Sequence, residues 1–310
     1  MRIFSYQGRR GKGVGVMAGD TRFVALAEAA PDLPGSLKAV LELPDGLARA
    51  RRAADGKPAE HEISEIVFLP PIEEPNAIWA LALNFKLHIQ ETGLTTSDKY
   101  PHLFMRHAGS LVGHGQALRC PPFDVSQEHD YEGELAVVIG KGGRHIPVEK
   151  ALDHVAGYCP FNEGSVREFQ RHNRNFGLGK NFEESGSIGP WIMTPDESGD
   201  IAKQHVITRL NGVERQKSTL SDMLFPVEQV IHYLSTGYRL RSGDIIAMGT
   251  PGALPKPAGE AHDPDRQRGR HKVEGKLSMR PGDRVEVEIT GVGVLANPVA
   301  ADEPVAYRVG

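Results

Sequence analysis

Glycine and proline interrupt this chain so often that they leave little room for long regular helices. The 310 residues include 35 glycines and 22 prolines, spread along the whole sequence. Both residue types mark turns and the ends of elements, so this spacing favours many short strands. Apolar runs with strand-like composition lie between the breaks. Together they predict an α+β, β-rich fold.

The strand-like runs follow one another from residue 77 onward. They cover residues 77–85, 134–141, 189–194, 205–212, 244–250 and 284–299. Helical patterns are fewer, and they fall at 35–54, with a break near Pro44, at 148–154 and at 225–238. Residues 1–28 are interpreted as a hairpin with its turn at Ala18-Gly19-Asp20. Strands this numerous predict a rolled or barrel-like sheet.

A proline-rich passage at 70–78 is the best candidate for a domain boundary. We therefore expect a small N-terminal module over 1–70 and a catalytic domain over 71–310. Residues 251–276 are rich in Pro, Gly and charge and predict a long surface loop or insertion. The basic run at 266–272 lacks interleaved aromatic residues, which favours a solvated loop over a nucleic-acid patch.

The charge balance gives no electrostatic reason to expect nucleic acid or an anionic membrane as a partner. There are 36 basic and 40 acidic residues, for a formal net charge of −4. No apolar run approaches the roughly 18 residues of a spanning helix, and the first residues do not resemble a signal peptide. Two cysteines, Cys120 and Cys159, are too few for a disulfide framework. We expect a cytoplasmic protein with reduced thiols.

The segment from Asp130 to Gly140 is the most informative part of the sequence. Side chains alternate between the faces of a strand, so Asp130, Glu132 and Glu134 would share one face. Like charges two residues apart repel, and a divalent cation such as Mg²⁺ or Ca²⁺ would compensate them. The alternative is an ordinary acidic strand that faces solvent.

A second candidate constellation is the pair His88 and Glu91, which follows an apolar strand. Their spacing of three residues places them on one helix face. A carboxylate beside an imidazole raises its pKa and fixes its tautomer, which suits a general base that acts on water. The alternative is a plain surface contact, because the chain contains thirteen histidines.

Taken in order, several short motifs from about Ile72 to Pro298 resemble the fumarylacetoacetate hydrolase family. The motifs are Asn84-Phe85-Lys86-Leu87-His88 with Glu91, Glu132-Gly133-Glu134, Asn162 to Gln170, Gly179-Lys180-Asn181-Phe182, Ile188-Gly189-Pro190-Trp191, Gly249-Thr250-Pro251 and Pro281-Gly282-Asp283. This resemblance implies a mixed rolled β-sheet core with a small N-terminal module. It also implies that Glu132, Glu134 and Glu163 hold Mg²⁺ or Mn²⁺, with Ca²⁺ as an alternative.

The resemblance also implies roles for other residues. His88, assisted by Glu91, would activate water, and Lys180 would stabilise developing negative charge. Arg167, Gln170 and Thr250 would contact a small 2-oxo or diketo acid. The leading expectation is hydrolysis of a C–C bond in an acylpyruvate or related acid through a metal-stabilised enolate. Isomerisation or decarboxylation of a muconate-type 2-oxo diacid is the close alternative, and a non-catalytic binder is the third. A homodimer is expected.

The sequence departs from the family pattern at several of these positions. Glu163, Glu168 and Glu183 stand where Asp is usual, and Phe85 replaces a Tyr. Arg106-His107 stands where Lys-Pro is common. These changes bear on the identity of the substrate more than on metal binding.

Overall fold

Two antiparallel strands in the middle of the chain organise the fold. The computed structural model describes residues 1–86, 99–255 and 277–302. In it β11 (Gly133–Ile139) and β12 (Val155–Asn162) pair from Gly133↔Asn162 to Ile139↔Val155. The pairing is antiparallel, so the start of β11 lies beside the end of β12.

Every residue of β11 is buried, and its side chains alternate between two hydrophobic cores. Leu135, Val137 and Ile139 belong to one core, while Ala136 and Val138 belong to the other. Because both faces are covered, the strand is continuously apolar and does not alternate with polar residues. This explains why the run from Leu135 to Ile139 was recognisable from the sequence.

The central pair belongs to a mixed sheet of thirteen strands in the described part of the chain. Its main path runs β4-β3-β2-β1-β15-β12-β11-β18-β6-β7, while β5, β8 and β14 pair off this path. Its members are β1 (Arg2–Gly8), β2 (Gly11–Ala18), β3 (Arg22–Ala25), β4 (His61–Glu62), β5 (Val67–Phe68), β6 (Ile78–Ala82), β7 (His102–Arg106), β8 (Leu111–Val112), β14 (Gly186–Ile188), β15 (Ile192–Met193) and β18 (Ile245–Ala247), with β11 and β12.

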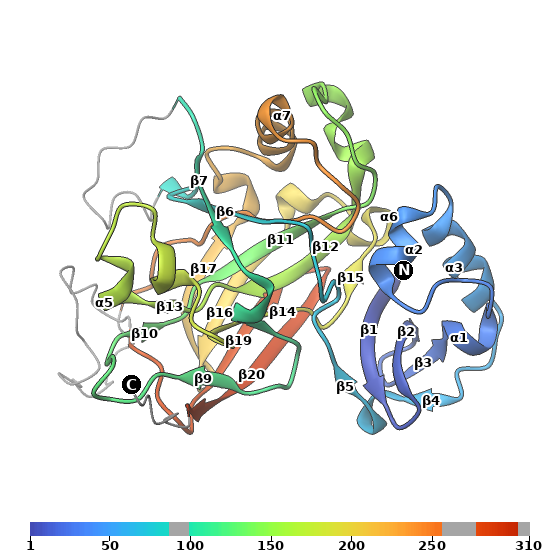
Figure 1. Cartoon of the computed structure of the whole chain (residues 1–310), viewed down its shortest axis with the longest axis horizontal. Helices are drawn as coiled ribbons and strands as arrows, with labels where there is room; N and C mark the ends of the chain where they lie inside the picture. The colour runs from blue at the N-terminus through green and yellow to red at the C-terminus, as the bar shows by residue number, and fades with distance from the viewer. Residues whose placement is uncertain (87–98, 256–276, 303–310) are drawn as a thin grey trace, which may run out of the picture.

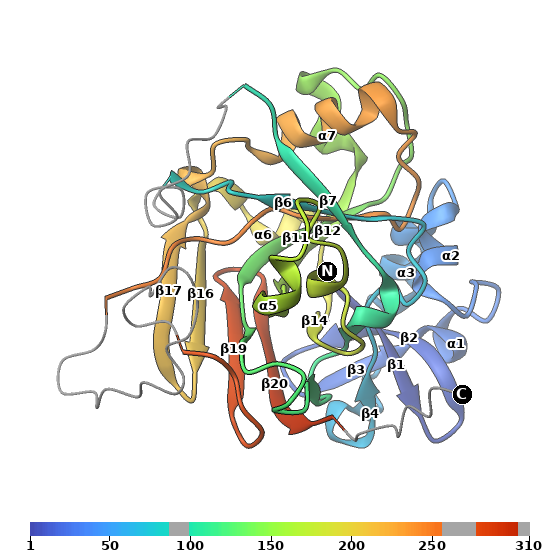
Figure 2. The same ribbon diagram turned by 60° about the vertical axis from the view of Figure 1, so that its left-hand side comes forward.

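A second sheet packs against one face of the central strands. Its order is β17-β16-β19-β20-β9, and Figure 2 shows four of these strands side by side. The members are β9 (Leu118–Cys120), β16 (His205–Leu210), β17 (Val213–Thr219), β19 (Arg284–Ile289) and β20 (Gly293–Ala301). A short separate pair is formed by β10 (His129–Asp130) and β13 (Ser165–Val166). These sheets confirm the prediction of a β-rich α+β fold.

Helices are short and lie around the sheets (Figure 1). The α-helices are α1 (Leu26–Ala29), α2 (Leu37–Glu42), α3 (Gly46–Ala54), α5 (Arg167–Gln170), α6 (Pro195–Ser198) and α7 (Val227–Gly237). The 3₁₀ helices are η1 (Ile63–Glu65), η2 (Ala108–Ser110), η3 (Val148–His154), η4 (Gly177–Lys180), η5 (Ile201–Lys203) and η6 (Leu220–Asp222). The helical patterns at 35–54, 148–154 and 225–238 are thus confirmed, including the break near Pro44. None of the helices described is both long and apolar enough to cross a membrane.

The hairpin interpretation of residues 1–28 was wrong in one respect. The glycine-rich stretch that begins at Gly11 is itself a strand, β2, between β1 and β3. A Cβ at Gly15 would lie 2.5 Å from the ring of Phe4, and one at Gly13 would lie 2.8 Å from the ring of Tyr6. The glycines therefore make room for aromatic rings that pack across the strand.

The N-terminal strands continue the sheet of the rest of the chain. β1 pairs with β15 through Arg2↔Met193 and Ile3↔Ile192. In Figure 1 the blue N-terminal segment, with α1 to α3, occupies one end of the molecule. The division into a module over 1–70 and a catalytic domain over 71–310 stays a prediction.

Candidate metal centre

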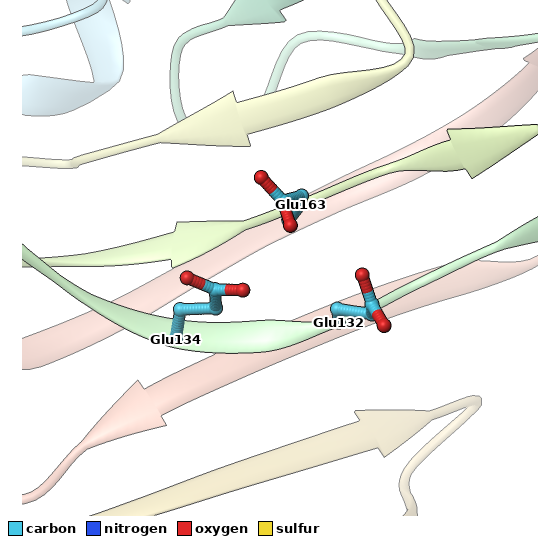
Figure 3. Close-up of side chains that lie close together, drawn as sticks. All are labelled: Glu132, Glu134 and Glu163. Atoms are coloured by element: carbon cyan, nitrogen blue, oxygen red, sulfur yellow. The ribbon is translucent and has the colours of Figure 1, made fainter. Parts of the chain in front are cut away.

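Three glutamates meet where β11 begins and β12 ends. Glu132 directly precedes β11, Glu134 is its second residue, and Glu163 directly follows β12. One carboxylate oxygen from each lies within 4.8 Å of the others. Figure 3 shows the three side chains gathered in the space between the two chain segments. The pairing Gly133↔Asn162 is what brings these positions together.

The cluster is buried, which makes its negative charge costly. Glu132 is 3% exposed, and Glu134 and Glu163 are each 1% exposed. Burial, together with the neighbouring Glu163 and Glu132, raises the pKa of Glu134 well above its usual value. Lys180 and the Gly249 N–H, which donates to Glu134 Oε2 over 2.8 Å, act in the opposite direction.

The donor set fits a divalent cation. Carboxylate oxygens are the ligands that Mg²⁺ and Mn²⁺ prefer. Glu163 Oε1 is buried without a hydrogen-bond donor among the described residues, and the nearby Arg106 Nη1 is 3.8 Å away. An oxygen left this way can serve as a metal ligand. The extra methylene of Glu163, compared with the usual Asp, leaves its carboxylate within the cluster.

Two predicted site residues supply positive charge to these acids. Lys180 Nζ donates to Glu132 Oε2 and, over 2.8 Å, to Glu163 Oε2. Arg167 Nη2 lies 2.6 Å from Glu132 Oε1. Burial lowers the pKa of Arg167, but Glu132 and Asp130 more than offset this, so its pKa is raised. Both side chains lie beside the carboxylates.

Tight backbone packing places Lys180 next to Arg167. Lys180 ends η4 and Arg167 begins α5. A Cβ at Gly179 would lie 2.2 Å from the backbone nitrogen of Gln170, so only glycine allows η4 to approach α5 this closely. Arg167 and Lys180 thus reach the cluster from two short helices that pack closely against each other.

The prediction that one continuous strand carries Asp130, Glu132 and Glu134 was wrong, although Asp130 and Glu132 both contact Arg167 Nη2. β10 ends at Asp130 and β11 starts at Gly133, so no continuous strand carries all three. Asp130 instead accepts hydrogen bonds from the Tyr131 backbone N–H and from Arg167 Nε, both over 2.8 Å. It holds Arg167 and takes no part in the carboxylate cluster.

Gln170 and Thr250 both lie near the cluster in the structure, and each already has a polar partner. Gln170 Oε1 accepts from Arg167 Nη1 over 2.7 Å. Thr250 is buried, and its hydroxyl donates to the Gly133 carbonyl over 3.0 Å. Their contacts with a substrate stay proposals. His88 and Glu91, the predicted water-activating pair, lie outside the described residues.

Arg106 is one residue beside the cluster that the sequence analysis did not assign to the site. It is 2% exposed, and its Nη1 donates to the Gly164 carbonyl over 3.0 Å, directly after Glu163. Burial lowers its pKa, whereas Glu163, Glu134 and Glu132 raise it. The sequence signal is the Arg106-His107 pair, which stands where Lys-Pro is common in the family.

These features define a buried cluster of three carboxylates, with donor chemistry suited to a cation, at the ends of two central strands of the sheet; a lysine and an arginine contact it. A family model described as fumarylacetoacetate (FAA) hydrolase C-terminal matches residues 77–300. The chain belongs to this family, and both the resemblance and the fold expected from it are confirmed.

Named relatives cover nearly the whole chain. Oxaloacetate tautomerase YisK from Bacillus subtilis is 31% identical over 303 residues, which cover 92% of this chain and 95% of that protein. The human mitochondrial oxaloacetate tautomerase FAHD2A is 32% identical over 275 residues, which cover 87% of this chain and 81% of that protein.

A solved structure extends the comparison. Maleylpyruvate hydrolase from Sphingobium sp. SYK-6, in complex with manganese(II) and pyruvate, superposes with a TM-score of 0.76 at 25% identity. The match covers 98% of this chain and 100% of that one. The named relatives are thus enzymes that act on small acids, and they include tautomerases and a hydrolase.

Proposed function

We propose that this protein is a divalent-metal-dependent enzyme that converts a small 2-oxo acid through its enolate, and that its main reaction is keto–enol tautomerisation of an oxaloacetate-like diacid. The observation that carries the proposal is the buried cluster of Glu132, Glu134 and Glu163 with Lys180 beside it. An enolate needs positive charge near its oxygen, and this site concentrates cations and cation ligands in a small buried volume.

The three glutamates would hold Mg²⁺ or Mn²⁺, and the bound ion would supply a Lewis acid for a carbonyl oxygen. Lys180 is 3% exposed, so its ammonium would face developing negative charge without competition from bulk water. Arg167 keeps about a fifth of its side chain exposed and would bind a substrate carboxylate in the fork geometry that guanidinium allows.

Proton transfer is the remaining requirement of tautomerisation. In the proposed reaction His88, paired with Glu91, takes the proton from the carbon next to the carbonyl and delivers it to the enolate oxygen, which gives the enol. In the reverse direction the proton moves from the enol hydroxyl back to that carbon. The same pair would activate water if the enzyme cleaved a C–C bond. The two reactions therefore share a site and differ in whether water enters.

Tautomerisation is favoured because two relatives that span most of the chain are oxaloacetate tautomerases. Hydrolysis of a C–C bond in an acylpyruvate is the second candidate, supported by the similarity to maleylpyruvate hydrolase with manganese and pyruvate. Isomerisation or decarboxylation of a muconate-type diacid is a further alternative, and it would pass through an enolate of the same type. We also propose a homodimer, which light scattering at micromolar concentration would test.

The deciding experiment follows the ultraviolet absorbance of enol-oxaloacetate as it decays, with Mn²⁺, with Mg²⁺ and with EDTA. We expect metal-dependent acceleration by the wild type and none by His88→Ala. In parallel, acylpyruvates and hydroxymuconate diacids are incubated with the enzyme and their products separated. Cleavage products without tautomerase activity would replace the first candidate by the second. Binding of these acids without turnover of any of them would make the protein a binder.

A further inference from the structure

We propose that Gln216 is a positioning residue that sets the spacing of the metal ligands Glu132 and Glu134. The inference rests on the proposed metal centre and adds a residue to it that no motif had marked. Gln216 lies on β17, in a different sheet from the glutamates, and is 1% exposed. Its carboxamide reaches the backbone of Gly133, the single residue between the two ligands.

The contacts of Gln216 and Thr250 hold both polar groups of Gly133. The Gly133 N–H donates to Gln216 Oε1 over 3.0 Å. The Thr250 hydroxyl donates to the Gly133 carbonyl over 3.0 Å and accepts from Gln216 Nε2 over 2.9 Å. Gln216 Nε2 also donates to the Pro251 carbonyl over 2.8 Å. One buried carboxamide therefore links the strand of the ligands to the Gly249-Thr250-Pro251 segment.

The sheet itself explains why side chains are needed at this point. β11 and β18 pair with Ala136 opposite Ala247, and the ladder continues as the Met248 N–H donates to the Leu135 carbonyl over 2.9 Å. In the same register Thr250 would stand opposite Gly133. The backbone leaves the ladder at Gly249, whose φ is +88°. Gln216 and Thr250 then supply the hydrogen bonds that a neighbouring strand would otherwise make.

A β-bulge directs Gln216 into the site. β16 and β17 pair Thr208 with Gln216 and Arg209 with Glu214, so Arg215 is the extra residue. Consecutive residues Arg215 and Gln216 are both buried, unlike the alternation of a regular strand. Bulges of this kind re-aim side chains beside functional sites. The bulge thus points a polar side chain at the backbone between two ligands.

If Gln216 fixes the separation of the ligands, its loss should weaken metal binding more than folding. We compare the wild type with Gln216→Met, which keeps the length of the side chain and removes its hydrogen bonds. Asn297→Leu is the matched control, because Asn297 is also 1% exposed and donates to two backbone carbonyls, both over 2.8 Å. Mn²⁺ affinity is measured from the electron paramagnetic resonance signal of free Mn²⁺, and thermal midpoints are recorded for the metal-free proteins.

We expect Gln216→Met to weaken Mn²⁺ binding by about tenfold or more, as is typical when partners of metal ligands are removed. Asn297→Leu should lower the thermal midpoint by a comparable amount and leave Mn²⁺ affinity unchanged. Mn²⁺ affinity of Gln216→Met within twofold of the wild type would overturn the inference while the metal centre stands. No Mn²⁺ binding by the wild type would overturn both. If Gln216→Met does not fold, Thr250→Val removes the linking hydroxyl and is judged by the same thresholds.

Discussion

The two ends of β11 are equally buried, yet they do opposite things for the stability of the chain. From Leu135 to Ile139 the strand presents apolar side chains to cores on both faces. At its start, Glu132 and Glu134 place carboxylates into the same dry interior. The apolar end drives folding by burial, whereas the acidic end must be compensated by cations. The apolar end also fixes the register that brings the acids together.

The largest effect should come from neutralising one carboxylate at the acidic end. Glu134→Gln should lower kcat/KM by about a thousandfold, because several kcal/mol of charge stabilisation depend on the metal and each 1.4 kcal/mol is a factor of ten. The same change should raise the thermal midpoint of the metal-free protein, since burial and the like charges of Glu163 and Glu132 raise the pKa of Glu134. Steady-state kinetics and thermal unfolding with and without Mn²⁺ provide the readouts.

Glu184→Gln is the matched control for this prediction. Glu184 forms a partly exposed ion pair with Arg119 over 3.0 Å, outside the cluster. Such pairs contribute about 0–1 kcal/mol, so stability and activity should change little. Full activity of Glu134→Gln, or an unchanged Mn²⁺-induced shift of its midpoint, would remove Glu134 from the metal centre.

Truncation at the apolar end should give the reverse pattern. Ile139→Ala should reduce the free energy of unfolding by about 2–5 kcal/mol through lost burial and a residual cavity. Mn²⁺ affinity should stay the same, because Ile139 lies five positions along the strand from Glu134, a distance of about 17 Å. Urea unfolding measures the loss of stability, and Mn²⁺ titration measures the metal affinity. Weakened Mn²⁺ binding would mean that packing at Ile139 affects the position of the glutamates at the other end of the strand.

Acid should lower the free energy of unfolding through His129, which lies on β10 shortly before β11. Burial lowers the pKa of His129 to about 4, against about 6.5 in the unfolded chain. The unfolded state therefore binds the proton more readily, so this part of the stability is complete above pH 6.5 and is lost as the pH falls toward 4. Between pH 7 and pH 5 the loss from this group is about 2 kcal/mol.

His129→Gln should reduce that loss, because glutamine keeps a donor for the Ser185 carbonyl and does not titrate. His129 Nε2 contacts that carbonyl over 3.1 Å in the structure. The measurement is urea unfolding at both pH values, and the quantity compared is the change in unfolding free energy for each protein. Equal changes in wild type and variant would mean that folding does not lower the pKa of His129.

An effect of about the same size is expected at Gly133, which lies between Glu132 and Glu134 at the acidic end of β11. A Cβ at Gly133 would lie 1.9 Å from Thr208 Oγ1 and 3.2 Å from Thr208 Cβ. Gly133→Ala should therefore destabilise the protein by about 1–3 kcal/mol through overpacking. Adding Thr208→Ala should recover part of this loss, since it removes the clashing hydroxyl. A double-mutant cycle in thermal unfolding measures the coupling, and strict additivity would contradict the contact.

The apolar end of β11 was predictable because its pattern is local. A continuous run of apolar residues between Glu134 and Gly140 indicates a buried strand. The acidic triad was predictable in a different way. Glu132 and Glu134 are close in sequence, but Glu163 joined them through the resemblance to a family, since no spacing rule connects residues thirty positions apart.

Arg106 and Gln216 were not assigned to the site from the sequence, although the Arg106-His107 pair departs from the family pattern. Each acts on the backbone beside a ligand, at Gly164 and at Gly133, from a remote strand. Their function depends on how β7 and β17 are placed in three dimensions, which leaves no periodic trace. The glycine-rich start of β2 was misread for the same reason, because the rings that cover it come from β1 and β3.

The pairing of β1 with β15 also has a consequence for the order of events at the ribosome. Arg2 lies opposite Met193, so part of the edge of the first strand must wait for about 190 further residues. At 5–20 residues per second this takes about 10–40 s. β5, which pairs with Tyr6 and Gln7, covers the other part of that edge much earlier. A nascent chain that stalls between the two stages would present a bare strand edge to its neighbours.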